Sequence, residues 1–200
     1  MSASAEKPQN SDARVTGGVF VAVVGPSGAG KDTLMNFARN ALGGRDEMFF
    51  VRRVITRPAD GATEDHIPAT PGQFEEQARN GRFAFSWDAH GLKYGLPVEI
   101  DERIRAGQCA VCNGSRAALQ GLAGRYANFV VISITASPEV IARRLALRGR
   151  ESEAEIRRRL DRSASLGSPW PGAVVIDNSG TVEAAGKELV DAILQASTRR

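Results

Sequence analysis

The stretch GPSGAGKDTL, residues 25–34, decides the fold of this 200-residue chain. It nearly matches the phosphate-binding loop pattern, which is Gly, four residues, Gly-Lys and then Ser or Thr. The part from glycine to lysine is complete, but Asp32 occupies the hydroxyl position and Thr33 follows one place late. The apolar run GVFVAVVG before the loop predicts a buried strand, and DTLMNFARNALGG after it predicts a helix. A strand, a glycine-rich turn and a helix in this order predict a site for nucleotide phosphates.

The loop supplies most of the predicted nucleotide contacts. Its backbone amides can surround a phosphate because glycines let the chain curl closely, and the following helix adds the positive end of its dipole. Lys31 is predicted to be catalytic, because its charge can follow the transferred phosphoryl group. The residues predicted to bind the nucleotide here are Gly25, Pro26, Ser27, Gly28, Ala29, Gly30, Lys31, Asp32 and Thr33.

Asp32 has two interpretations. An acid in the first turn of a helix is favourable by itself, so Asp32 can be an ordinary surface carboxylate. It can also bind Mg²⁺, directly or through a water, because hard carboxylate oxygens suit that ion. The second interpretation is favoured, because the Asp that usually ends a neighbouring strand is missing: CAVC runs into Asn113 and FVVISIT contains no acid. We therefore expect ATP and Mg²⁺ as cofactors, with Asp32 at the metal.

Further apolar runs alternate with helical patterns along the chain. FFVRRVIT, CAVC, FVVISIT and AVVID predict strands, and TVEAAGKELVDAILQA predicts a closing amphipathic helix. This alternation predicts an α/β fold with a central parallel sheet flanked by helices, and the phosphate-binding loop within it is typical of a P-loop kinase. We expect a disordered tail over residues 1–16 and a single domain over residues 17–200. The lack of a signal sequence or a membrane-length apolar run predicts a cytoplasmic protein without a membrane partner.

Composition narrows the expected partners. The formal net charge is only +3, and 22 of the 26 basic residues are arginine, which suits bidentate phosphate contacts. The arginines are scattered without a platform of stacking aromatic residues, so no nucleic-acid partner is expected. The two cysteines of CAVC are expected to be buried strand residues, because His66 and His90 lack metal-ligand spacing.

Two regions interrupt the alternation. Residues 56–100 mix turn residues, short aromatic-rich strands and a helix that Thr70 begins, with Gln73 completing a capping box. Residues 143–162 form a predicted helical hairpin rich in arginine. Both regions are expected to lie over the ligand-binding edge of the sheet, the first as an acceptor-binding insertion and the second as a lid.

The lid arginines also have two interpretations. Arg144 and Arg148 are four residues apart and share a helix face. A lid that closes over ATP can neutralise charge as the phosphoryl group moves, so Arg144 is predicted to bind the nucleotide, and Arg148 and Arg159 are predicted to be catalytic. The spacing of Glu155 and Arg159 equally fits an ion pair on a solvated helix.

These motifs resemble the guanylate kinase-like family of P-loop phosphotransferases over residues 18–194. GPSGAGK is similar to its phosphate loop, ITRPADGATEDH to its acceptor-phosphate segment, HGLKYG to its acceptor-site tyrosine turn and RLALRGRESEAEIRRRL to its lid. The guanine-reading residues of that family are absent. Ser86 precedes Trp87 where a Glu is expected, and Asn113 ends the strand where an acid is expected. As a separate departure, Ala59 and Asp60 occupy the place of a second Arg. A binding site that lacks the polar partners of a buried purine edge loses specificity for that purine, so a guanylate kinase is not expected. Trp87 itself is expected to lie in the core of the insertion.

The segments GKDTL, TRPADGATEDH, SWDAHGLKYGLP and VCNGSRAAL together resemble the ribose 1,5-bisphosphate phosphokinases, a family of the phosphonate-degradation pathway. The resemblance implies transfer of the terminal phosphoryl of ATP to the 1-phosphate of ribose 1,5-bisphosphate, which yields 5-phospho-α-D-ribose 1-diphosphate and ADP. A phosphate oxygen is already an anionic nucleophile, so no general base is required. The implied acceptor-binding residues are Arg57, Tyr94 and Arg116, with Asp65 or Glu64 orienting a sugar hydroxyl or an arginine.

Two other functions remain open at this stage. One is a nucleoside monophosphate kinase of the guanylate kinase type that acts on another base. The other is a non-catalytic guanylate kinase-like binding module, which is disfavoured because Gly30 and Lys31 are intact. The sequence does not decide the oligomeric state and leaves a homodimer open.

Overall fold

A five-stranded parallel sheet forms the centre of the computed structural model, which describes residues 13–58, 65–147 and 170–199. Its strand order is β2-β7-β1-β8-β9, and every pairing is parallel. The strands are β1 (Val19–Val24), β2 (Met48–Phe50), β7 (Cys109–Asn113), β8 (Phe129–Thr135) and β9 (Val174–Asp177). All residues of β1 and β7 are buried, as expected for strands covered on both faces. The predicted α/β fold is confirmed.

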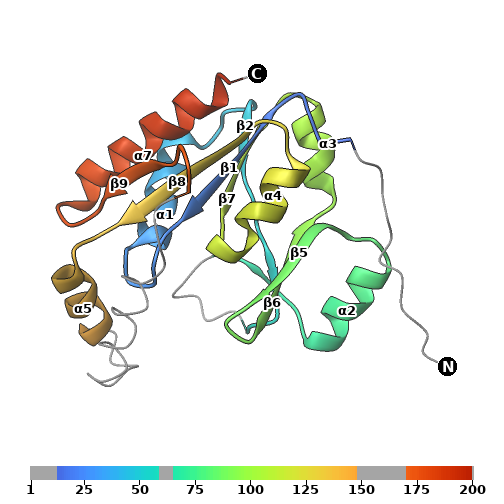
Figure 1. Cartoon of the computed structure of the whole chain (residues 1–200), viewed down its shortest axis with the longest axis horizontal. Coiled ribbons are helices and arrows are strands. Elements are labelled where there is room, and N and C mark those ends of the chain that lie inside the picture. Colours follow the sequence, from blue (N-terminus) through green and yellow to red (C-terminus); the bar gives the residue numbers. More distant parts are fainter. Residues whose placement is uncertain (1–12, 59–64, 148–169, 200) are drawn as a thin grey trace.

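Helices cover both faces of this sheet (Figure 1). Val19, Val21 and Val23 of β1 face α1 and α7, whereas the alternating residues of β1 face the opposite layer with α3 and α4. The helices are α1 (Lys31–Leu42), α3 (Glu99–Arg105), α4 (Leu119–Arg125), α5 (Pro138–Leu147) and α7 (Val182–Ser197). A hydrophobic core therefore lies on each face of the sheet. Together they fix the loop after β1 at the edge formed by the carboxyl ends of the strands, where α/β proteins bind ligands.

The predicted acceptor-binding insertion is built on a second, four-stranded sheet. Its order is β4-β3-β6-β5, from β3 (Val54–Ile55), β4 (Ile67–Pro68), β5 (Phe83–Ala89) and β6 (Leu92–Pro97), with α2 (Pro71–Arg79) beside it. The predicted capping box is confirmed: Thr70 Oγ1 accepts from Gln73 N at 3.2 Å, and Thr70 N donates to Gln73 Oε1 at 2.8 Å.

FFVRRVIT differs from its prediction as one strand. It is divided into β2, which belongs to the parallel sheet, and β3, which belongs to the second sheet. Val51 N still donates to Val111 O of β7 at 2.8 Å, but Arg53 O already accepts from Ile67 N at 2.8 Å. The apolar pattern continues across the break, because both sheets bury this segment.

The predicted tail also ends earlier than residue 16. Val15 is buried and forms a bridge with Tyr126, and the Arg14 guanidinium donates to the carbonyls of Ala123 and Tyr126, each at 2.7 Å. Residues 13–16 therefore belong to the folded body. The lid beyond Leu147, with Arg148 and Arg159, lies outside the described residues.

Cys109 and Cys112 are buried strand residues, as predicted. They lie in the cores on opposite faces of the sheet, and burial raises the pKa of the Cys109 thiol to about 11. Within the described ranges there is no group of three or more His, Cys, Asp or Glu suited to a metal. No helix in the described part of the chain is both long and apolar enough to cross a membrane.

Candidate active site

The phosphate loop joins β1 to α1 in a conformation that requires two of its glycines. Gly25 has a φ of 155°, and a Cβ there would lie 2.2 Å from Ile134 O of β8. Gly30 has a left-handed φ of 87°, and a Cβ there would lie 2.4 Å from Asn178 Nδ2. Both positions therefore exclude a side chain, and the loop can pass close to its neighbours.

Lys31 begins α1 and reaches back over the loop. Its Nζ donates to Gly25 O at 2.9 Å and to Pro26 O at 3.2 Å. The side chain therefore crosses the loop, and its ammonium group lies within reach of a phosphate held by the loop amides. Thr33 is exposed in the first turn of the same helix.

The carbonyl of Ala29 fixes the outer side of the loop. It accepts from Asn178 Nδ2 at 2.7 Å and from Arg144 Nη1 at 3.3 Å, and Arg144 Nη2 donates to Asn178 O at 2.9 Å. Arg144 thus lies beside the loop, where its guanidinium contacts backbone carbonyls. Asn178 was missed in the sequence, although it follows the predicted strand AVVID in an Asn-Ser-Gly turn.

Asp32 is paired with Asn113 across the site. Asn113 is buried at the end of β7, and its Nδ2 donates to Asp32 Oδ1 at 2.9 Å. The loop carboxylate therefore lies at the strand end where P-loop enzymes usually carry an Asp. These oxygen donors fit Mg²⁺, which keeps several waters and substrate phosphate oxygens among its ligands.

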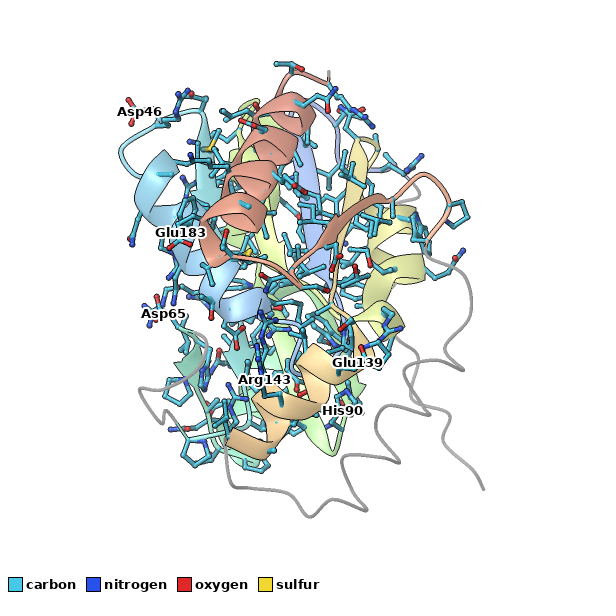
Figure 2. All side chains as sticks on the ribbon, turned by 90° about the vertical axis from the view of Figure 1, so that its left-hand side faces the viewer. Asp46, Asp65, His90, Glu139, Arg143 and Glu183 are labelled. Atoms are coloured by element: carbon cyan, nitrogen blue, oxygen red, sulfur yellow. The ribbon has the colours of Figure 1, made fainter. Side chains whose placement is uncertain are left out.

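A hollow extends from this pair along α1 towards the second sheet. Its lining includes Asp32, Met35, Asn36, Arg39, Val51, Asp65 and Asn113. Asp65 lies beside α1 (Figure 2), where its carboxylate contacts Arg39 at 3.6 Å and Arg52 at 2.9 Å. Asp65 therefore forms ion pairs with two arginines beside the hollow. Arg39 and Arg52 were missed because nothing local relates them to Asp65.

Arg57 and Tyr94 belong to the second sheet. Arg57 is half-buried just after β3, and its carbonyl lies 3.1 Å from Nε2 of the buried His66, which was not predicted as a site residue. Tyr94 lies on β6, and its ring stacks on Trp87 with centroids 5.2 Å apart. Trp87 packs against the core beneath, as predicted.

Arg116 begins a short 3₁₀ helix, Arg116–Ala118, after β7. The Ser115 hydroxyl accepts from Ala117 N at 3.3 Å and caps this turn. Burial lowers the pKa of the Arg116 guanidinium, which makes no hydrogen bond or ion pair with any described residue. Arg116 therefore presents a charge at the same sheet edge as Asn113. Glu64, Arg148 and Arg159 lie outside the described residues.

Comparison with known proteins places the chain in a family. No protein-family model matches it. Ribose 1,5-bisphosphate phosphokinase PhnN of Agrobacterium fabrum is 44% identical over 178 residues, which cover 89% of this chain and 97% of that protein. The protein of the same name from Bradyrhizobium diazoefficiens is 42% identical over 199 residues, with 100% of both chains covered.

Among solved structures, guanylate kinase from Anaplasma phagocytophilum is similar in fold, with a TM-score of 0.63 and 17% identity over 92% of this chain and 88% of that chain. At this identity the likeness establishes the guanylate kinase-like fold alone. The sequence identity to the phosphokinases extends over nearly the whole of both chains, and it establishes the family as well as the fold. The chain therefore belongs to the ribose 1,5-bisphosphate phosphokinase family.

Proposed function

We propose that this protein transfers the terminal phosphoryl group of ATP to the 1-phosphate of ribose 1,5-bisphosphate. The products are 5-phospho-α-D-ribose 1-diphosphate and ADP. The observation that carries the proposal is the 42–49% identity to proteins named for this activity over most of the chain. We also propose that the protein works in the cytoplasm, with ATP and this phosphorylated sugar as its partners.

The reaction needs positioning more than proton transfer. An oxygen of the acceptor 1-phosphate attacks the γ-phosphorus of ATP, the bond from that phosphorus to the β,γ-bridging oxygen breaks, and ADP leaves with the electron pair. The nucleophile is already anionic near neutral pH, so no base has to remove a proton. Lys31, which now contacts the carbonyls of Gly25 and Pro26, would exchange them for phosphate oxygens as it follows the transferred group.

Asp32 and Asn113 are the proposed metal residues. Asp32 would hold Mg²⁺ directly or through a water, and Asn113 orients the carboxylate through its hydrogen bond of 2.9 Å. The ion, when bound, supplies charge neutralisation at the ATP phosphates. Thr33 is proposed to donate its hydroxyl to a phosphate, and Arg144 to contact the nucleotide from beside the loop.

The acceptor is proposed to lie between the two sheets. Arg57, Tyr94 and Arg116 would bind it, and Asp65 would keep Arg39 and Arg52 in place at the edge of the hollow. Arg148 and Arg159 are proposed to neutralise charge from the lid during transfer. These roles follow from placement and charge.

A panel of acceptors tests the reaction. With ATP and Mg²⁺, purified protein should convert ribose 1,5-bisphosphate far faster than GMP, AMP or CMP, measured as ADP release. Better turnover of any of the three nucleotides would identify a nucleoside monophosphate kinase. Absence of turnover with every acceptor, alongside intact ATP binding, would favour the binding module.

Lys31→Ala tests the loop. It should abolish turnover, whereas Lys187→Ala, which removes an exposed lysine of α7, should not change it. Turnover that persists in Lys31→Ala would show that this lysine has no catalytic role.

A further inference from the structure

Arg53 is a buried cation to which the roles above assign nothing. It lies between β2 and β3 and is only 6% exposed. Its guanidinium carbon is 5.0 Å from the ring centroid of Tyr94 and 5.8 Å from that of Trp87. The two rings are themselves stacked, with an interplanar angle of 9°. Burial of a guanidinium is costly unless nearby groups compensate its charge, and the faces of the two rings supply part of this compensation.

The position of Arg53 is at the ligand-binding edge of the parallel sheet. Val51 N makes a hydrogen bond to Val111 O of β7, and the two strands run in the same direction. Arg53 and Asn113 each lie two residues beyond that bond. Arg53 therefore follows the last hydrogen bond of this segment to the parallel sheet, on the side of the sheet edge that carries the phosphate loop and the Asp32–Asn113 pair.

Arg53 and Tyr94 lie on the same face of the second sheet, and Arg57 follows the other end of β3. Side chains alternate along a strand, so Arg53 and Ile55 share one face, and the pairing of Ile55 with Tyr94 places the tyrosine there too. Arg57 lies in a bend two residues after β3 ends. One arginine therefore comes just before β3 and another comes shortly after it.

This face is turned towards the body of the protein. Trp87 and Phe85 pack against the core beneath, and a Cβ on Gly121 of α4 would lie 2.5 Å from the Phe85 ring. The short helix that begins with Arg116 contacts β5 on this side. Arg53 and Arg116 therefore both belong to the part of the acceptor region that adjoins the parallel sheet.

We propose that Arg53 is a specificity-determining residue that binds the acceptor phosphate which does not react, the 5-phosphate, while Arg57 and Tyr94 hold the 1-phosphate. This inference rests on the proposed function. The acceptor carries a phosphate at each end of a small sugar, and one arginine precedes and another follows the short strand β3. The Tyr94 and Trp87 rings lie near the Arg53 guanidinium carbon and attract its charge, while a phosphate is bound through guanidinium N–H groups, so the two kinds of contact are compatible.

The rings also explain why an arginine suits this position. Burial beside the rings limits the motion of the guanidinium, so less conformational freedom is lost when a phosphate binds. A lysine would keep the positive charge but would lose the planar fork that makes two parallel hydrogen bonds to a phosphate. Comparison of Arg53→Lys with Arg53→Gln therefore separates the effect of the positive charge from the effect of the planar guanidinium geometry.

The experiment compares acceptors with and without the 5-phosphate. For Arg53→Gln, kcat/KM for ribose 1,5-bisphosphate should fall about 100-fold, because charge-assisted hydrogen bonds are lost, while kcat/KM for ribose 1-phosphate should change less than about threefold. Arg53→Lys should show a smaller loss with the same preference. Arg79→Gln, an exposed arginine at the end of α2, is the matched control and should leave both values unchanged.

A binding measurement gives a second readout that does not depend on turnover. Ribose 5-phosphate, which has only the non-reacting phosphate, should bind the wild-type protein in calorimetry and bind Arg53→Gln at least about tenfold more weakly. Thermal unfolding checks that each variant is folded. If Arg53→Gln is unfolded, the same comparison is made with Arg53→Lys.

Two results separate this inference from the proposed function. Equal losses on both acceptors, with unchanged affinity for ribose 5-phosphate, would show that Arg53 only supports Tyr94 and would overturn the inference. Failure of the wild-type protein to use ribose 1,5-bisphosphate would overturn the proposed function, and the inference that rests on it.

Discussion

Asp32 and Asn113 both differ from the residues that a P-loop enzyme usually has at their positions, a Ser or Thr on the loop and an Asp at the strand end. The acid lies on the loop, the amide lies at the end of β7, and a hydrogen bond of 2.9 Å joins them. Because the two side chains meet, the carboxylate reaches nearly the same place from the other side. With the proposed role of Asp32, the departure from the loop pattern would keep a hard oxygen donor where Mg²⁺ would bind.

Asp32→Ala is expected to raise the Mg²⁺ concentration required for half-maximal activity, because a charged ligand is lost. The double variant Asp32→Ser, Asn113→Asp returns the acid to the strand and should recover part of the loss. Binding of Mn²⁺ to the complex with ADP, measured by electron paramagnetic resonance, gives a readout apart from turnover. Asp191→Ala, at an exposed position on α7, is the control. Unchanged metal dependence in Asp32→Ala would make Asp32 an ordinary acid at a helix start.

Residue roles could be predicted from sequence only where they are local. The spacing from Gly25 to Lys31 predicts the loop, because its conformation depends on neighbours in the chain. The Asp32–Asn113 contact joins residues 81 positions apart, so the sequence can suggest only that both lie at strand ends. The contacts of Arg53 depend on how two strands of the second sheet pair, which no local pattern records.

Among the elements, the turn between β9 and α7 holds the phosphate loop. Asn178 is 1% exposed, and together with Arg144 it satisfies the Ala29 carbonyl. That carbonyl is thereby held on the outer side of the loop. This turn, which comes from near the carboxyl terminus, therefore supports a loop near the amino terminus.

Asn178→Ala is expected to weaken ATP binding about tenfold, because a buried carbonyl loses a hydrogen bond and the loop gains freedom. Calorimetry with ATP measures the affinity, and amide hydrogen exchange should rise within residues 25–30. Asn40→Ala, at an exposed position on α1, serves as the matched control. Unchanged ATP affinity together with unchanged exchange would contradict this role.

Secondary-structure elements, like residue roles, could be predicted where they depend on neighbouring residues and not where they depend on distant partners. The sequence predicts β1, α1, β7, β8, β9 and α7 correctly, because each has its own apolar period and its own start or stop signal. It does not predict the division of FFVRRVIT, because both halves are apolar and only their partner strands differ. The second sheet was likewise expected only as short strands in an insertion.

At the scale of the whole molecule, a buried acid joins α3 to α4. Asp101 is 3% exposed and contacts the guanidinium of Arg125, and it accepts from the Tyr126 hydroxyl at 3.1 Å. Tyr126 also stacks on Phe20 of β1, with centroids 4.4 Å apart. Burial, and then the negative charge of Asp101, raise the pKa of Tyr126.

This raised pKa predicts a loss of stability in alkali. Above about pH 10 the tyrosine ionises in the unfolded chain but stays neutral in the folded protein, so unfolding releases a proton and the free energy of unfolding falls as pH rises. Urea unfolding at pH 8 and pH 10.5 measures this fall, which should be smaller in Tyr126→Phe. A fall of the same size in Tyr126→Phe would assign the alkaline sensitivity to other groups.

The division of one apolar segment between two sheets limits how acceptor preference can be engineered. An exchange of the second sheet with that of a guanylate kinase would need a junction inside residues 51–53, where the last hydrogen bond to β7 and the first hydrogen bond to β4 are two residues apart. A junction placed before this segment alters the parallel sheet, and a junction placed after it leaves Arg53 behind. The boundary between the two sheets is therefore a poor site for recombination, and point substitutions at the residues proposed to bind the acceptor, Arg53, Arg57 and Tyr94, are the more practical route to a change of substrate.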